Sequence, residues 1–221
     1  AEVDHLREQL DELTFRCEIL AEDVDVTNNP FSYAFDTKHI EPVEYDASHH
    51  LYLSFDFNVD PITCIAVQQI NGCINVVKEF YLKNSDIYQL CDHIIVAFPK
   101  ASFIITGDST GANRSALTQG NLGYYDVVQT KLRLGRAQMK QPSVNPSIRD
   151  TRVLVNSLLQ NYCVKIDPSC EWLIKDLKYV EVDSEGDIIK DRRTDLRKAD
   201  LLDCFRYYCN SFHRDWIRFF N

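Results

Sequence analysis

Apolar stretches between residues 51 and 82 predict three consecutive strands. The segments LYLSFDFNV, TCIAVQQI and CINVVKEFYL are rich in β-branched and aromatic residues, and only Asn71-Gly72 separates the second from the third. Asn-Gly between two such segments is the strongest short signal for a β-hairpin. We therefore expect the main part of the chain to begin with an antiparallel β-meander.

Helices and strands are predicted to alternate after this meander. SDIYQLCDHIIVAFPK has apolar residues at helical spacing behind a capping Ser85 or Asp86, and ASFIITGD predicts a short buried strand. The later expected elements are one or two helices interrupted by Gly120 and Gly123, a helix in NPSIRDTRVLVNSLLQNY, strands in CVKIDP and KYVEVDSEGDIIKD, and a final helix over residues 196–212. The order predicts a mixed α/β domain in which an antiparallel meander leads into parallel strand pairs.

The first 50 residues have a different character. Residues 1–20 carry Leu6, Leu10 and Leu13 near helical spacing, whereas residues 21–50 are predicted to form an irregular linker. We place the boundary between this leader and the main domain near His50.

Composition limits the class of protein. With 221 residues, 45% of them hydrophobic, the chain can form one substantial core, and no apolar stretch approaches the roughly 20 residues of a membrane span. The acidic start does not have the pattern of a secretory signal peptide. Eight cysteines without a CxxC pair predict reduced, buried thiols instead of disulfides or a zinc site.

The net charge of −9 is unevenly distributed. Residues 1–50 contain 13 acidic and 3 basic residues, whereas residues 51–221 contain 20 acidic and 21 basic ones. The acidity that argues against a nucleic-acid partner therefore belongs to the leader. Between positions 131 and 152 the sequence contains six basic residues and one acidic residue, Asp150. The basic residues form either a phosphate-binding surface or a solvated face: Lys131, Arg133, Arg136, Lys140, Arg149 and Arg152.

Several acids occupy positions that invite a chemical explanation. Asp56 lies between two phenylalanines in the first strand, and Asp108 follows the fourth strand. Asp203 lies on the last helix, three residues after Asp200. Asp60 lies where the first strand should end. Taken singly, the loop and helix acids have ordinary structural alternatives, as turn formers or as partners of the helix dipole. Asp56 has no such local role, because ionised carboxylates are rarely buried in strands.

The central strand, its neighbour and the last helix can bring these acids to one edge of a sheet. Adjacent carboxylates repel each other and raise each other's pKa values. Mg²⁺ or Mn²⁺ removes this penalty, and two such ions about 4 Å apart can promote phosphodiester cleavage. Asp56, Asp108 and Asp203 are therefore the candidate catalytic and metal-binding residues, and Asp200 and Asp60 are further candidates.

In this order the motifs resemble the nuclease domain of the phage terminase large subunit, the DNA-packaging motor protein. LSFDFNVDPITCIAV is similar to that family's first strand, and IITGDSTGANRS to its second acidic motif. NPSIRDTRVLVNSLL resembles the helical segment beyond, and DLLDCFRYY the terminal Asp-Ala-x-Arg-Tyr helix, with Cys204 in place of Ala. The resemblance covers most of residues 51–221, and the leader resembles the tail that follows the family's ATPase domain.

The resemblance implies an RNase H-like mixed sheet flanked by helices, and an endonuclease that cuts concatemeric duplex DNA with one or two Mg²⁺ or Mn²⁺ ions. It places the metal at Asp56, Asp108 and Asp203. Arg114, which follows the second acid in the sequence, is a further candidate for DNA contact, with an ordinary surface role as the alternative. No G-x-x-x-x-G-K-[ST] loop occurs, so the ATPase is expected in another part of a longer protein. The implied partners are DNA, that ATPase domain, the small terminase subunit and the portal, in the host cytoplasm and away from membranes.

Three other functions remain open at this point. One is a different RNase H-like nuclease, such as a Holliday-junction resolvase or a transposase. Another is an actin-like nucleotide-binding module, because GDSTGAN resembles a phosphate-cradling loop. The third is a non-catalytic assembly domain in which the acids pair with arginines.

Overall fold

A computed structural model describes residues 2–20, 29–190 and 198–217. The strands are β1 (Leu51–Asp56), β2 (Ile62–Ile70), β3 (Cys73–Leu82), β4 (Phe103–Gly107) and β5 (Cys163–Ile166). The α-helices are α1 (Glu2–Gln9), α2 (Glu12–Thr14), α3 (Ile87–Ala97), α4 (Tyr124–Lys131), α5 (Ile148–Asn161), α6 (Glu171–Tyr179) and α7 (Asp200–His213). Within these residues, no helix combines the length and the apolar character that crossing a bilayer requires.

The five strands form one mixed sheet in the order β4-β1-β2-β3-β5. β1, β2 and β3 are antiparallel neighbours, and β4 and β5 join parallel to β1 and β3 respectively. The β2–β3 hairpin turns at Asn71 and Gly72, both with positive φ, as a tight Asn-Gly turn requires. The predicted meander and the parallel pairing that follows it are both confirmed.

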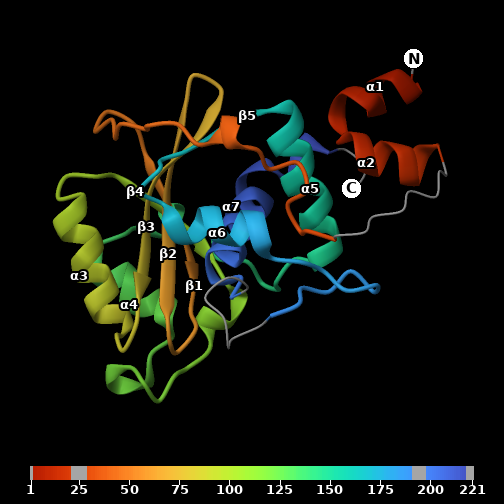
Figure 1. Ribbon diagram of the computed structural model, residues 1–221. Coiled ribbons are helices and arrows are strands. Elements are labelled where there is room, and N and C mark those ends of the chain that lie inside the picture. Colours follow the sequence, from red (N-terminus) through yellow and green to blue (C-terminus); the bar gives the residue numbers. More distant parts are fainter. Residues whose placement is uncertain (1, 21–28, 191–197, 218–221) are drawn as a thin grey trace.

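Helices cover both faces of this sheet (Figure 1). One core contains α3 and α4 together with Phe55 and Phe57, and the other contains α5, α6 and α7 together with Ile65 and Val67. The predicted capping of the first of these helices is confirmed, since the Asp86 carboxylate accepts the Gln89 amide at the start of α3. α7 crosses directly over β1 and β2, so the last helix lies against the centre of the sheet.

Two sequence predictions differ from the structure between residues 163 and 190. Residues 171–177, for which no element was predicted, belong to helix α6, because Trp172, Leu173 and Leu177 bury one face against the sheet, and the helix continues into the expected strand as far as Tyr179. Of the expected strand over residues 178–191, the described part after this helix, up to residue 190, forms a turn with two isolated bridges, one between Val182 and Ile188 and one between Glu181 and Pro30. Its Ser-Glu-Gly turn is present, with Gly186 at positive φ.

The leader packs into the same core as the main domain. Leu10, Phe15 and Phe31 are buried against α5 and its neighbours. Asp11 is also fully buried, because its carboxylate accepts the Tyr33 hydroxyl at 2.7 Å and the Thr14 amide at 2.9 Å. The boundary near His50 therefore separates two regions of different charge, but residues on both sides of it share one core.

Loops cover both outer edges of the sheet. Beside β4, Met139 bridges Ile105, and the Lys140 amide donates to the Ile105 carbonyl at 2.7 Å. Beside β5, Ile40 of the leader bridges Ile166, and the Glu41 amide donates to the Ile166 carbonyl at 3.1 Å. Each edge strand thus pairs with a short segment on its outer side.

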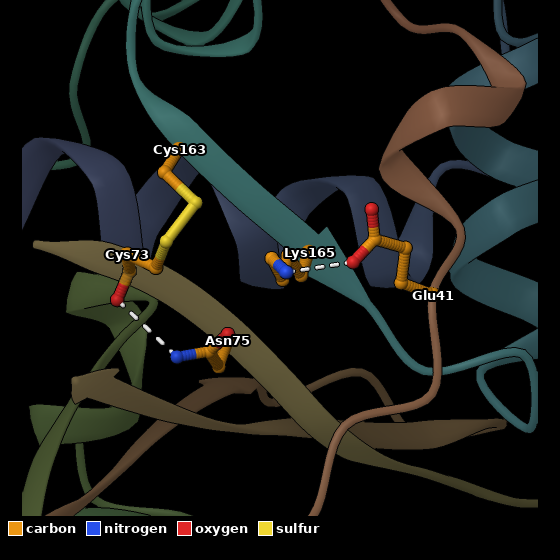
Figure 2. Close-up of a disulfide and its surroundings, with 5 residues drawn as sticks. All are labelled: Glu41, Cys73, Asn75, Cys163 and Lys165. Atoms are coloured by element: carbon orange, nitrogen blue, oxygen red, sulfur yellow. Dashed lines mark hydrogen bonds and ion pairs between the residues drawn. A yellow bond between two sulfur atoms is a disulfide. The ribbon is translucent and has the colours of Figure 1, made fainter. Parts of the chain in front are cut away.

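A disulfide joins Cys73 to Cys163, which corrects the prediction that all cysteines are reduced. The two residues are register partners in the parallel pair of β3 and β5, with their Cα atoms 4.5 Å apart. Figure 2 shows the bond between the strands, with the ion pair of Lys165 and Glu41 further along β5. The two cysteines are 90 positions apart in the sequence, so no local motif could predict the bond. Five other cysteines are buried free thiols, as predicted: Cys64, Cys91, Cys170, Cys204 and Cys209.

Reduction of this disulfide is expected to lower the free energy of unfolding by about 4 kcal/mol, because the bond closes a long loop in the unfolded chain. Urea unfolding with and without a reducing agent measures the effect. The double variant Cys73→Ser/Cys163→Ser is the control, and reducing agent should leave its midpoint unchanged. An equal effect of reducing agent on parent and double variant would contradict the prediction.

Candidate functional site

The carboxyl ends of β1 and β4 bring Asp56 and Asp108 to the same edge of the sheet. β1 ends at Asp56, earlier than the predicted end near Asp60, so the acid is the last residue of the strand. Phe55 and Gly107 are register partners, and the Asp108 amide donates to the Phe55 carbonyl at 2.9 Å. Gly107 has φ +150°, and a Cβ there would lie 2.4 Å from that carbonyl oxygen. Only glycine permits this approach of the two strand ends.

Helix α7 brings the third and fourth acids to this edge. The Ser54 hydroxyl donates to the Cys204 carbonyl at 2.7 Å, which ties the helix to β1. Thr63, the register partner of Asp56 on β2, directs its hydroxyl to the Asp200 carbonyl at 3.4 Å. Small side chains on both surfaces allow this close packing. Asp200 and Asp203 both lie in the first turn of the helix and are almost completely buried.

The start of α7 is fixed by a buried acid that sequence reasoning missed. The Asp176 carboxylate, on α6, accepts the amides of Leu201 at 2.9 Å and Leu202 at 3.1 Å. These amides have no partner within the helix, so Asp176 acts as a cap supplied by another element. Burial raises the pKa of Asp176 to about 7, although the two amides oppose this shift.

Asp176→Asn is expected to gain stability relative to the parent as the pH rises from 5 to 8. Between the ordinary aspartate pKa and about 7, the folded protein holds a proton that the unfolded chain has released. The stability contributed by protonated Asp176 is complete below about pH 4 and is lost as the pH rises through 7. The difference in unfolding free energy should therefore change by about 3 kcal/mol in favour of the variant, as measured by urea unfolding. A difference that stays constant with pH would contradict this assignment.

Asp56 is surrounded by the negative charges of three other carboxylates, those of Asp203, Asp200 and Asp108. It is 4% exposed, and its Oδ2 accepts the Asn58 side-chain amide at 2.5 Å. The same Asn58 amide donates to Asp200 Oδ1 at 3.1 Å, so Asn58 bridges two acids. Burial raises the pKa of Asp56 well above its usual value; the charge of Asp203 adds to this effect, followed by those of Asp200 and Asp108, while Lys190 opposes it. These carboxylates are therefore close enough to repel one another.

Asp203 is held by two cations. Its Oδ1 accepts Arg206 Nε at 2.6 Å, and its Oδ2 accepts Lys190 Nζ at 2.7 Å. Arg206 is 6% exposed, and its guanidinium carbon lies 4.6 Å from the centroid of the Tyr207 ring. Burial lowers the pKa of Lys190, but the charges of Asp203, Asp56 and Asp200 outweigh that effect and raise it overall. Lys190 is therefore a charged partner of Asp203 at neutral pH.

Asp108 is half-buried and oriented by its own loop. Asn145 donates to Asp108 Oδ1 at 2.7 Å, and the Thr110 amide and hydroxyl donate to its two oxygens at 2.9 and 2.6 Å. Asp60 lies further out, at the rim, where it is exposed and accepts the Asn84 amide at 2.9 Å. The structure thus gathers Asp56, Asp200 and Asp203, with Asp108 beside them and Asp60 outside.

Protein donors hold these carboxylates in their present positions. Among the residues that the structure describes, no three His, Cys, Asp or Glu side chains are arranged to hold a metal ion directly. The chemistry of the donor set nevertheless fits a divalent cation. Asp56 bears a pKa raised by burial and by three neighbouring carboxylates, and a hard cation with oxygen ligands would remove that excess of negative charge.

The predicted basic surface divides into partly buried and exposed residues. Arg152 is half-buried and donates to Asn29 and to the carbonyls of Pro30 and Phe31, so in this structure it stabilises the leader. Lys131 pairs with Asp92 across α3 and α4 at 2.5 Å. The other predicted residues are exposed: Arg114, Arg133, Arg136, Lys140 and Arg149.

Asn58, Asn145 and Lys190 were missed by sequence reasoning, as was the role of Arg206. Arg206 had a signal, because it is the Arg of the DLLDCFRYY motif, three residues after Asp203 on the same helix. Asn58 follows Asp56 by two residues. At this spacing its side-chain amide could have been expected to donate to the Asp56 carboxylate. Nothing in the local sequence of Lys190 indicates that it reaches Asp203.

Comparisons place this fold among solved structures. No known family profile matches the chain, and no curated protein matches it. The large terminase of a thermophilic bacteriophage superposes with a TM-score of 0.73 at 14% identity, covering 95% of this chain and 50% of that one. The P22 large terminase nuclease domain gives 0.59 at 15% identity, covering 85% and 93%. The nuclease domain of the bacteriophage SPP1 large terminase, solved with bound Mn, gives 0.50 at 17%, covering 85% and 99%.

This chain therefore spans about half the length of the thermophilic phage protein and nearly matches the extent of the two separate nuclease domains. At these identities the likeness establishes the fold. The chain has the RNase H-like fold of terminase nuclease domains, as its sequence motifs predicted.

Proposed function

We propose that this chain is the nuclease part of a phage DNA-packaging terminase, a metal-dependent endonuclease that cuts concatemeric duplex DNA. One observation carries the proposal: Asp56, Asp200 and Asp203 are buried together, with Asp108 beside them, in this fold. A set of mutually repelling carboxylates is costly to a fold unless a ligand neutralises it. The SPP1 domain of the same fold was solved with bound Mn, which supports a divalent metal here.

Asp56, Asp108 and Asp203 would hold one or two Mg²⁺ or Mn²⁺ ions, with Asp200 close enough to contribute. The bound metal would supply Lewis acidity, which lowers the pKa of water and neutralises charge on the cleaved phosphate. The protein's own donors prepare the acids for this role. Asn58 holds Asp56 beside Asp200, and Asn145 holds Asp108 in place.

Arg206 and Lys190 fix the third acid. Their two cationic groups hold the Asp203 carboxylate in one orientation and balance its charge within a nearly buried site. Lys190 is partly exposed, with 37% of its side chain accessible, so its ammonium can also contact a phosphate at the rim. Because Lys190 opposes the rise in the pKa of Asp56, its charge also acts on the centre of the cluster.

The exposed residues of the predicted basic surface are proposed DNA contacts. Asn145 binds Asp108, and Lys140 and Arg149 lie on either side of Asn145 in the sequence. Arg114 belongs to the loop that follows Asp108, and Arg133 and Arg136 follow α4. Phosphate contacts from such side chains fix the position of duplex DNA without reading its sequence.

The remaining parts of the proposal concern the whole protein. Because the chain spans half of the large terminase from the thermophilic bacteriophage, we place an ATPase domain elsewhere in the same full-length protein. The small terminase subunit and the portal are the proposed assembly partners, and the host cytoplasm is the proposed location.

Plasmid cleavage tests the proposal. Supercoiled plasmid is incubated with the chain in Mg²⁺, in Mn²⁺ and in EDTA, and nicked and linear products are followed on gels. We expect cutting with either metal and none in EDTA. A preference for four-way junctions over linear duplex, together with a stable dimer, would favour a resolvase instead. Thermal stabilisation by nucleotides without cutting would favour the actin-like alternative.

A further inference from the structure

A pocket of about 290 Å³ adjoins the acid cluster, and charges of both signs line it. Asp200 and Asp60 contribute carboxylates, and Lys83 and Lys198 contribute ammonium groups. Asp200 is also the acid that Asn58 bridges to Asp56, so the pocket opens directly beside the proposed site.

The sheet explains why Lys83 lies near these acids. β1 ends at Asp56, which pairs with Thr63 at the start of β2, and Thr63 in turn pairs with Tyr81 at the end of β3. Lys83 follows β3 directly. The carboxyl ends of β1 and β3 therefore lie at the same end of the sheet. The exposed basic residues beside Asp108 belong to the other side of β1, since β4 and β2 flank β1 on opposite sides.

An aromatic pair orders the lysines of this region. Tyr81 and Trp172 stack with ring centroids 4.6 Å apart and an angle of 9° between their planes. Lys83 Nζ lies 5.8 Å from both centroids, and Lys175 Nζ lies 4.3 Å from that of Trp172. Lys198 Nζ donates to the Tyr81 hydroxyl at 3.4 Å. Three ammonium groups thus surround one rigid pair of rings.

Glu79 anchors this pair. Its carboxylate accepts the amides of Trp172 at 3.0 Å and Leu173 at 2.8 Å, which fixes the start of α6 against β3. The indole is thereby held at the surface beside the pocket. The aromatic contacts restrict the lysine side chains before any ligand binds, which lowers the entropy cost of ordering them in a complex.

We propose that Lys83, Lys175 and Lys198, ordered by Tyr81 and Trp172, form a backbone-phosphate site for the DNA strand that reaches the acid cluster. The inference rests on the proposed nuclease function. A strand whose cleaved phosphate lies at Asp56 carries further phosphates past the cluster, where acids alone would repel them. Ammonium groups on one side of the cluster and the exposed basic residues on the Asp108 side then hold the duplex at both ends of the cut. The contacts are to phosphate, so the site is independent of base sequence.

The test compares the double variant Lys83→Met/Lys175→Met with the control Lys100→Met/Lys178→Met. All four lysines are partly or fully exposed, and Lys178 lies on the same helix as Lys175. Binding of a fluorescent duplex of about 30 base pairs is measured at salt concentrations between about 50 and 200 mM with EDTA present, and plasmid cleavage is measured separately in Mn²⁺. Loss of two phosphate contacts should make the slope of the logarithm of the binding constant against the logarithm of the salt concentration shallower by about 2 in the first double variant than in the parent. Lys83→Arg/Lys175→Arg should restore it.

The outcomes separate the two proposals. A shallower slope and slower cleavage for the first double variant alone support the phosphate site. If the parent binds and cuts DNA while both double variants behave like it, the phosphate site is wrong and the nuclease function stands. If the parent neither binds nor cuts DNA with any metal, the nuclease function fails, and the phosphate site fails with it.

Discussion

Asp56→Asn is expected to reduce metal-dependent cleavage at least about 10²-fold, the order of loss that follows removal of one key charged or donor group from an active site. Asn keeps the shape of the side chain and can still accept the Asn58 amide through its oxygen. It removes the negative charge at the centre of the cluster. A neutral ligand there binds a hard divalent cation weakly, so the loss should appear with both Mg²⁺ and Mn²⁺.

The same substitution is expected to leave the fold as stable as the parent or to stabilise it. Burial and the charges of Asp203, Asp200 and Asp108 raise the pKa of Asp56, which means that its ionised form is unfavourable in the metal-free protein. An uncharged residue at this position avoids that repulsion. Thermal unfolding in EDTA and plasmid cleavage in Mn²⁺ together make the measurement.

Glu44→Gln is the matched control, because it neutralises an exposed acid outside the site and should change neither property. An Asp56→Asn variant that cuts as fast as the parent would exclude Asp56 from the active site. A variant that loses cleavage because it unfolds would show that Asp56 supports the fold, and it would contradict the predicted gain from reduced repulsion.

Arg206→Met is expected to lower the free energy of unfolding by about 1–3 kcal/mol, because buried hydrogen bonds to a charged group are lost while Asp203 keeps Lys190 as its second cationic partner. Arg206 is 6% exposed, and it donates to Asp203, to the Pro146 carbonyl at 3.3 Å and to Thr151 at 3.4 Å. Met fills a similar volume, so the loss comes from charge and hydrogen bonds, with little effect from a cavity.

A double-mutant cycle isolates the ion pair. With Asp203 already changed to Asn, the added cost of Arg206→Met should fall by at least about 1 kcal/mol, because no buried anion then loses one of its two cationic partners. Arg136→Met, at an exposed position, should cost less than about 0.5 kcal/mol. Equal costs of Arg206→Met in the two backgrounds would show that the pair with Asp203 contributes nothing to stability. Urea unfolding of all variants provides the data.

Local signals predicted those parts of the fold that are encoded over short distances. The Asn71-Gly72 turn and the periodicity of α3 and α5 led to the correct elements. The helix expected over residues 196–212 is present as α7, from Asp200 to His213, while residues 196 and 197 lie outside the described part of the chain. Asp56 was recognisable because a carboxylate is unusual in a buried strand, and Asp108, Asp200 and Asp203 because they lie where a strand ends or a helix begins.

Features that depend on distant residues were not predictable in this way. The Cys73–Cys163 disulfide requires β5 to pair with β3, a choice made by tertiary packing. Residues 21–50 were predicted to form a linker because they carry turn and polar residues without a sustained period, but Phe31 is fully buried and the Tyr33 hydroxyl donates to the buried Asp11 carboxylate. Likewise, the ammonium of Lys190 reaches Asp203 only because the turn before it folds back towards α7.

The pairing of Ile40 and Glu41 with the outer edge of β5 has a consequence for self-association. An edge strand with free amides and carbonyls is a template on which a second molecule can add a strand. The leader occupies that place on β5, and the segment around Met139 does the same on β4. A chain shortened to begin at residue 51 would keep every acid of the site but would expose β5 to its neighbours. We therefore expect the leader to shield the outer edge of β5 from pairing with a second molecule, and a shorter version should keep residues 40 and 41 for this reason.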